Sequence, residues 1–124
     1  MTGLDAYERK LLEGWEEVFK RGQLTFWVLL SLKEGPKHMA QVRAWIDDIT
    51  DGAVGVEERS LYRSLQRFHD SELVISASAA SERGPDLKLY SLTAVGEHVL
   101  QAFIDRNIRL FLAPGVVRLL GEAG

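Results

Sequence analysis

The chain has 124 residues, which is enough for one domain with a modest hydrophobic core. It contains no cysteine, which excludes disulfide bonds, cysteine-ligated metal sites and thiol nucleophiles and is consistent with a reducing cytoplasm. The formal net charge is −3, whereas dedicated nucleic-acid-binding proteins are often strongly basic. The overall charge therefore argues mildly against a nucleic-acid partner, although a basic face can lie on an acidic body.

The sequence predicts no membrane partner. Its start, MTGLDAYERKLLEG, is charged, unlike a signal peptide. The longest apolar run, LTFWVLLSL, is too short to cross a bilayer. We therefore expect the protein to be located in the cytoplasm.

Apolar residues at helical spacing predict four helices in the first 70 residues of the chain. The first has an apolar stripe among alternating charges, and the second is apolar nearly all round, which predicts burial. Gly22 ends the first helix, and Gly35-Pro36 ends the second. Glu57 and Glu58 lie in the first turn of the fourth, where the helix dipole favours negative charge. The predicted helices cover residues 5–21, 24–33, 39–49 and 57–70.

A β-hairpin and a long last helix are predicted after these helices. Residues 73–77 begin with β-forming residues, residues 87–92 alternate apolar and polar, and the turn-rich stretch ASERGPD lies between them. Thr93 can cap a helix that we expect to continue until Pro114 stops it. A short apolar tail, residues 116–120, follows.

The order of these elements predicts the fold. Three helices followed by a hairpin are the layout of a winged helix-turn-helix, in which the last of the three helices enters the DNA major groove. The predicted fold class is mostly α (α+β), with an added N-terminal helix and a C-terminal dimerisation helix. We expect an N-terminal helix with a dimer contact in residues 1–22, the winged domain in 23–92, and the dimerisation helix and tail in 93–124.

Three stretches of the sequence match the pattern of a known family. VLLSLKEGPKH (residues 28–38) has the form of an apolar first helix with a Gly-Pro turn, and SLYRSLQRFHDSELV (60–74) that of a recognition helix entering a wing. LKLYSLTAVGEHVL (87–100) carries the most specific pattern, a wing strand with a Tyr-x-Leu-Thr-x-x-Gly junction into the last helix. Together they resemble the PadR family of bacterial transcriptional regulators, although the MarR family shares part of the junction. The resemblance covers roughly residues 24–100.

The chain departs from the usual PadR pattern at three places. The family usually has a glycine-tyrosine pair where this chain has Met39-Ala40, proline where it has Arg63, and glycine at the helix-to-strand corner where it has Glu72. These changes concern the DNA contacts more than the fold. Together with the acidic charge, they favour an alternative function, a winged-helix protein-interaction module that has lost DNA binding.

The fourth predicted helix has two different faces. At about 100° per residue, Leu61, Leu65 and Phe68 cluster on one side, which predicts packing against the preceding helix. Polar residues point the other way, among them arginine and glutamine, which read guanine and adenine edges and also bind phosphate. A DNA-reading surface is therefore predicted, and an ordinary solvated helix face is the alternative.

The flank of this helix and the wing supply further candidates. The family resemblance implies that the Tyr62 hydroxyl donates to a phosphate, whereas an aromatic ring at the edge of the core is the alternative. Basic wing residues can contact phosphate or the minor groove, and an ordinary exposed hairpin is the alternative. The candidate DNA-binding residues are Arg59, Ser60, Tyr62, Arg63, Gln66, Arg67, Arg83 and Lys88.

The last predicted helix has more apolar residues than one face needs, which indicates a partner, most simply a second copy of the chain. We expect a homodimer that reads a palindromic operator, with two recognition helices about 34 Å apart, as a repressor. The predicted dimer interface comprises Leu11, Trp15, Phe19, Phe103, Ile104, Ile108 and Phe111.

A ligand sensor is a further alternative. Met39, Trp45 and Trp27 could line a flat site for a small aromatic effector, although core packing is the simpler explanation. The three histidines lack ligand-like spacing, so no metal is expected. No nucleophile or phosphate-loop motif occurs, so we expect no enzyme, no catalytic residue and no cofactor.

Overall fold

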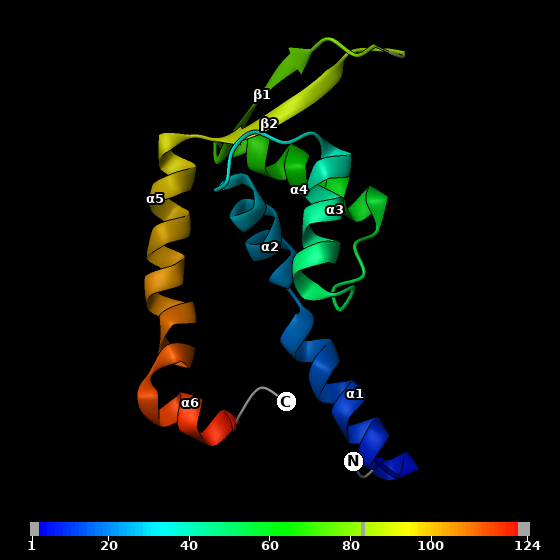
Figure 1. Cartoon of the computed structure of the whole chain (residues 1–124), viewed down its shortest axis with the longest axis vertical. Coiled ribbons are helices and arrows are strands. Elements are labelled where there is room, and N and C mark those ends of the chain that lie inside the picture. The colour runs from blue at the N-terminus through cyan, green and yellow to red at the C-terminus, as the bar shows by residue number, and fades with distance from the viewer. Residues whose placement is uncertain (1–2, 83, 122–124) are drawn as a thin grey trace.

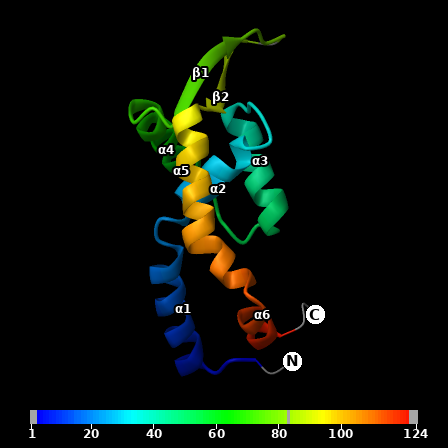
Figure 2. The same ribbon diagram turned by 90° about the vertical axis from the view of Figure 1, so that its left-hand side faces the viewer.

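The computed structural model describes residues 3–82 and 84–121. It confirms the predicted fold class: mostly helical, with one two-stranded antiparallel sheet that forms a wing. The wing lies at one end of the molecule, and the N- and C-terminal helices extend toward the other end (Figures 1 and 2). The elements are α1 (Ala6–Lys20), α2 (Gln23–Leu32), α3 (Met39–Thr50), α4 (Glu58–Asp70), β1 (Val74–Ala79), β2 (Leu87–Leu92), α5 (Ala94–Phe103), a π-helical turn (Ile104–Ile108), a 3₁₀ turn (Arg109–Leu112) and α6 (Pro114–Leu120).

The first helix is well capped but exposed. The Asp5 carboxylate accepts a hydrogen bond from the Glu8 N–H at 2.8 Å, and the Glu8 carboxylate accepts one from the Asp5 N–H at 3.0 Å. This reciprocal cap satisfies two N–H groups that the helix leaves unpaired. Gly22, at φ 84°, separates α1 from α2. No residue of α1 is buried, so its apolar stripe contributes little to the core of this chain.

The core lies between α2, α3 and α4 and is closed by the wing and α5. Leu61, Leu65 and Phe68 of α4 are buried in one cluster with Val42 and Ile46 of α3, as the helix periodicity predicts. The fully buried side chains include residues from α2, α3, α4 and β1. Packing of this kind fixes the rotation of α4 about its own axis, because only one rotation buries its apolar face in the core.

The wing is slightly longer than predicted on its first strand. β1 covers Val74–Ala79 rather than residues 73–77, and it pairs antiparallel with β2, with Val74 opposite Leu92. Pairing with a full partner strand carries β1 beyond the residues whose own β propensity is high. Lys37 adds an isolated bridge to Tyr90, with backbone N–O distances of 3.0 and 2.8 Å. The bridge ties the start of α3 to the base of the wing.

A hydrogen-bonded junction joins the wing to α5. The Thr93 hydroxyl donates to the Glu72 carbonyl oxygen at 2.6 Å and accepts from the Gly96 N–H at 2.9 Å. A Cβ at Gly96 would clash with the Leu73 carbonyl oxygen, so only glycine permits this close approach. Glu72 itself has φ 65°, the left-handed region that glycine usually occupies.

The last helix keeps its predicted extent but is not α-helical throughout. α5 ends at Phe103, and a π-helical turn and a 3₁₀ turn follow before α6. Ala113 has ψ 137° and leaves the helical region, as expected for a residue before proline. Pro114 begins α6 instead of ending a helix, because the first turn needs no hydrogen bond from its missing N–H. The predicted apolar tail, residues 116–120, is therefore helical and projects at an angle to α5 (Figure 2).

Candidate nucleic-acid interface

The outer face of α4 is polar and lies opposite the core. Arg59 and Arg63 are exposed, and Gln66 is half-buried, whereas Ser64 and Leu65 are buried on the other side. The helix begins at Glu58, and the side chain of its N-cap residue, Glu57, makes no capping hydrogen bond to the first turn. The structure thus brings the two arginines and the glutamine together on one face, as the helical spacing predicts.

Arg59 and Arg63 have no partner within the described part of the chain. Neither makes a hydrogen bond or an ion pair there, whereas Lys20, Lys37 and Arg109 are each paired with a carboxylate. Unpaired guanidinium groups keep all their donors for an external acceptor, and their fork geometry suits a phosphate or a guanine edge. The chemistry of this face is therefore that of an anion-binding or base-reading surface.

Tyr62 lies at the flank of α4 that faces α3 and the wing. Its side chain is 48% exposed and lines a shallow hollow with Met39 and Arg59. Burial raises the pKa of Tyr90 on β2, and the nearby Tyr62 adds to that shift. The Tyr62 ring thus borders the core while the residue remains accessible. This position fits both a hydroxyl that donates to a phosphate and an aromatic ring at the edge of the core.

Two predicted residues lie on the other flank of α4. Ser60 is half-buried and lines a hollow with Gln23 and Val54. Arg67 is within 3.5 Å of the Ser64 hydroxyl, and its guanidinium lies 5.8 Å from the centre of the Phe68 ring. Both residues therefore face away from the Tyr62 side, and the structure does not bring them onto the same surface as Tyr62.

The wing carries one described basic candidate. Lys88 is exposed on β2, opposite Ser78 of β1. Arg83 lies outside the described residues. The wing extends beyond the helical body, from the end at which α4 and the start of α3 lie (Figure 1).

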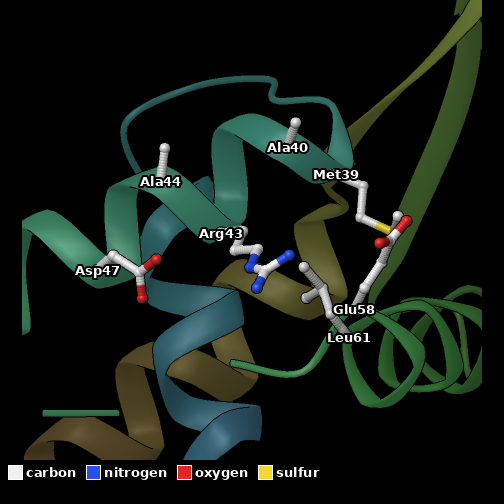
Figure 3. A pocket seen from close by; sticks show the side chains of 7 residues that line it. All are labelled: Met39, Ala40, Arg43, Ala44, Asp47, Glu58 and Leu61. Carbon is white, nitrogen blue, oxygen red and sulfur yellow. The ribbon is translucent and has the colours of Figure 1, made fainter. Parts of the chain in front are cut away.

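A pocket of about 290 Å³ lies between α3 and α4 (Figure 3). The Arg43 side chain points from α3 toward α4, where Glu58 and Leu61 complete the lining. Sequence reasoning did not bring Arg43 and Glu58 together, because spacing along one helix carries no information about a neighbour on another helix. The lining residues are Met39, Ala40, Arg43, Ala44, Asp47, Glu58 and Leu61.

The three residues considered for an aromatic effector do not form one site. Trp27 and Trp45 are half-buried against the core, and only Met39 lines the pocket between α3 and α4. Trp27 meets Phe26 edge-on with 5.4 Å between ring centres. Core packing therefore accounts for both tryptophans.

Large apolar side chains are exposed on both helical arms. Trp15 is 72% exposed on α1, and Phe111 is 45% exposed in the 3₁₀ turn. Ile104 is half-buried and packs against the core of its own chain, so it is less available to a partner than predicted. Ile108 is also half-buried. The remaining predicted interface residues, Leu11, Phe19 and Phe103, are exposed.

Two kinds of feature are absent from residues 3–82 and 84–121. No helix there is both long and apolar enough to cross a bilayer. No group of three or more histidine, aspartate or glutamate side chains there could hold a metal ion.

Solved structures with a similar fold include transcriptional regulators. A Bacillus subtilis PadR, solved in complex with operator DNA, has 17% sequence identity and a TM-score of 0.63 over 68% of this chain and 48% of its own. A PadR-like regulator from Bacillus cereus has 23% identity and a TM-score of 0.65 over 84% of this chain and 97% of its own. A PadR family regulator from Eggerthella lenta has 23% identity and a TM-score of 0.67 over 96% and 100%.

The sequence itself gives the family. No curated protein matches it significantly. Residues 28–102, more than half of the chain, match the transcriptional regulator PadR-like family. This segment begins in α2 and ends in α5, so it contains the three-helix body, the wing and the Thr93–Gly96 junction. The chain therefore belongs to the PadR-like family of transcriptional regulators.

Proposed function

We propose that this protein binds double-stranded DNA, with α4 in the major groove and the wing beside it. The observation that carries the proposal is the pair of unpartnered arginines, Arg59 and Arg63, on the face of α4 opposite the core. Arginine is the commonest reader of guanine in the major groove, and recognition helices use their first turns for base contacts. The Bacillus subtilis relative, solved in complex with operator DNA, supports DNA as the partner.

Three further residues complete the proposed surface. Gln66 lies one to two turns beyond the arginines and can read adenine, while Tyr62 and Lys88 contact phosphates on either side. Ser60 and Arg67 face the other flank of α4, so we assign them no base contact. A small basic surface on an acidic chain is sufficient, because affinity depends on the local charge near the phosphates.

The protein acts as a homodimer in this proposal. The exposed apolar side chains of α1 and of the segment after α5, including Trp15, Phe19 and Phe111, would otherwise form a patch of a kind that monomers rarely expose. When two copies pair about a two-fold axis, the identical patches cover one another, and the two α4 helices lie on successive turns of DNA. The site is then palindromic, and occupancy of it represses transcription in the cytoplasm. Residues 1–22 and 93–124 supply the interface, and residues 23–92 read the DNA.

A protein-interaction module without DNA binding is the second candidate. The net charge of −3 and the two glutamates at the start of α4 favour it, since both repel a polyanion. The same fold would then present α4 to a protein partner instead of DNA. The two functions differ in salt dependence, because release of counterions from DNA gives a steep loss of affinity with salt.

The test combines selection and titration. Wild-type protein is used to select bound fragments from random DNA, and the enriched sequence is then titrated with Arg59→Ala, Arg63→Ala and the control Arg21→Ala. We expect each α4 variant to lose about 1–3 kcal/mol of specific binding, while Arg21→Ala, exposed at the end of α1, binds like the wild type. Absence of any enriched sequence at low salt would refute the proposal and favour the interaction module.

A further inference from the structure

Glu58 is an unpaired carboxylate at the start of α4. Its side chain is exposed and makes no hydrogen bond or ion pair with any described residue. Two other exposed carboxylates are held by cations: Lys37 lies 3.1 Å from Glu34, and Arg109 lies 2.7 Å from Asp105. A first-turn glutamate gains a little from the helix dipole, but that gain requires no particular direction of the side chain. The Glu58 carboxylate is therefore free to accept hydrogen bonds from outside the chain.

Its position places it within the proposed DNA surface. Glu58 lines the hollow that also contains Arg59 and Tyr62, and it lines the pocket between α3 and α4 with Arg43. Figure 3 shows the Arg43 guanidinium extending from α3 toward the α4 side of this pocket, where Glu58 lies. A glutamate in this position faces the same partner as Arg59.

A free carboxylate facing DNA requires a specific explanation. Near phosphates it loses Coulomb energy, and Arg43 in the same pocket offsets part of that repulsion. The loss is compensated when the carboxylate meets a hydrogen-bond donor. In the major groove the amino group at N4 of cytosine is such a donor, and glutamate or aspartate accepts from it. Guanine presents only acceptors on that edge, so the same carboxylate disfavours guanine.

We propose that Glu58 determines specificity by accepting a hydrogen bond from a cytosine amino group, once in each half of the DNA site. The inference rests on the proposed function, namely DNA binding through α4. Glu58 then selects one base, Arg59 and Arg63 select or anchor their neighbours, and the acidic residue lowers affinity for sites that lack the cytosine. An acidic residue on the recognition helix then becomes a means of rejecting wrong sequences.

Substitution by glutamine at Glu58 and at the neighbouring Glu57 gives a matched pair of variants. Random-DNA selection is carried out with wild type, Glu58→Gln and Glu57→Gln, each checked for helical content by circular dichroism. Glutamine keeps the size of the side chain, removes the charge and reads adenine in place of cytosine. Glu57→Gln removes the same charge one residue earlier, at the cap of the helix. Any general effect of charge should therefore appear in both variants.

The expected result is a change at one position only. Glu58→Gln should shift the preferred base there from cytosine to adenine, with the ratio of the two affinities changing about tenfold, and Glu57→Gln should keep the wild-type sequence. If both variants bind all sequences more tightly and select the wild-type motif unchanged, Glu58 merely repels DNA and the inference is wrong. If wild type enriches no motif at all, the proposed function fails, and the role of Glu58 fails with it.

Discussion

Replacing Glu72 with glycine should stabilise the protein. Glu72 lies at the corner between α4 and β1 with φ 65°, where a residue with a Cβ costs about 1–2 kcal/mol. Its side chain is exposed and makes no hydrogen bond with a described residue, so its removal loses no contact. The corner is held by backbone groups: the Glu72 N–H donates to the His69 carbonyl oxygen at 3.1 Å, and the Glu72 carbonyl oxygen accepts from Thr93.

The magnitude follows from two opposing terms. Glycine removes the strain of about 1–2 kcal/mol in the folded state. It also makes the unfolded chain more flexible, which costs about 0.4–1 kcal/mol. The net gain should be about 1 kcal/mol, or about 4 °C in Tm for a chain of this length. Urea and thermal unfolding followed by circular dichroism measure both values, at one fixed protein concentration because dimerisation would also shift them.

Glu72→Ala is the matched control. Alanine removes the same charge but keeps a Cβ, and therefore keeps the strain at positive φ. It should give no gain in the free energy of unfolding. Equal stabilisation by alanine and glycine would trace the effect to the charge of Glu72, and a glycine variant no more stable than wild type would show that the corner is not strained.

Three further outcomes are expected. Gly96→Ala should lower the free energy of unfolding by about 1–3 kcal/mol in urea titrations, because the new methyl group overlaps the Leu73 carbonyl oxygen; an unchanged midpoint would contradict the close approach. Trp15→Glu should convert a dimer into a folded monomer in sedimentation at micromolar concentration, since Trp15 is 72% exposed in the single chain; a dimer that persists would remove α1 from the interface. Lys88→Ala should weaken binding to all DNA sequences alike and reduce the salt slope by about 1, whereas a change in the selected motif would indicate a base contact.

The sequence by itself determined the fold class and the orientation of α4. Helical spacing placed Leu61, Leu65 and Phe68 in the core and Arg59 and Arg63 outside, because one apolar stripe on a helix leaves only one way to bury it. Local turn and cap chemistry located the wing and the start of α5, since the Thr93 cap is formed by residues only three positions apart. These features depend on neighbours in the sequence, so a single chain is enough to predict them.

Only the tertiary structure shows the irregular turns and the change of direction after Phe103, and which residues of different helices lie together. Pro114 can end a helix or begin one, and only the backbone at Ala113 shows that it begins α6. The exposure of Trp15 followed from the direction in which α1 leaves the body, which the periodicity of α1 does not contain. Arg43 and Glu58 share a pocket because α3 and α4 cross there. Contacts between helices depend on how whole elements pack, and spacing within one helix does not encode that packing.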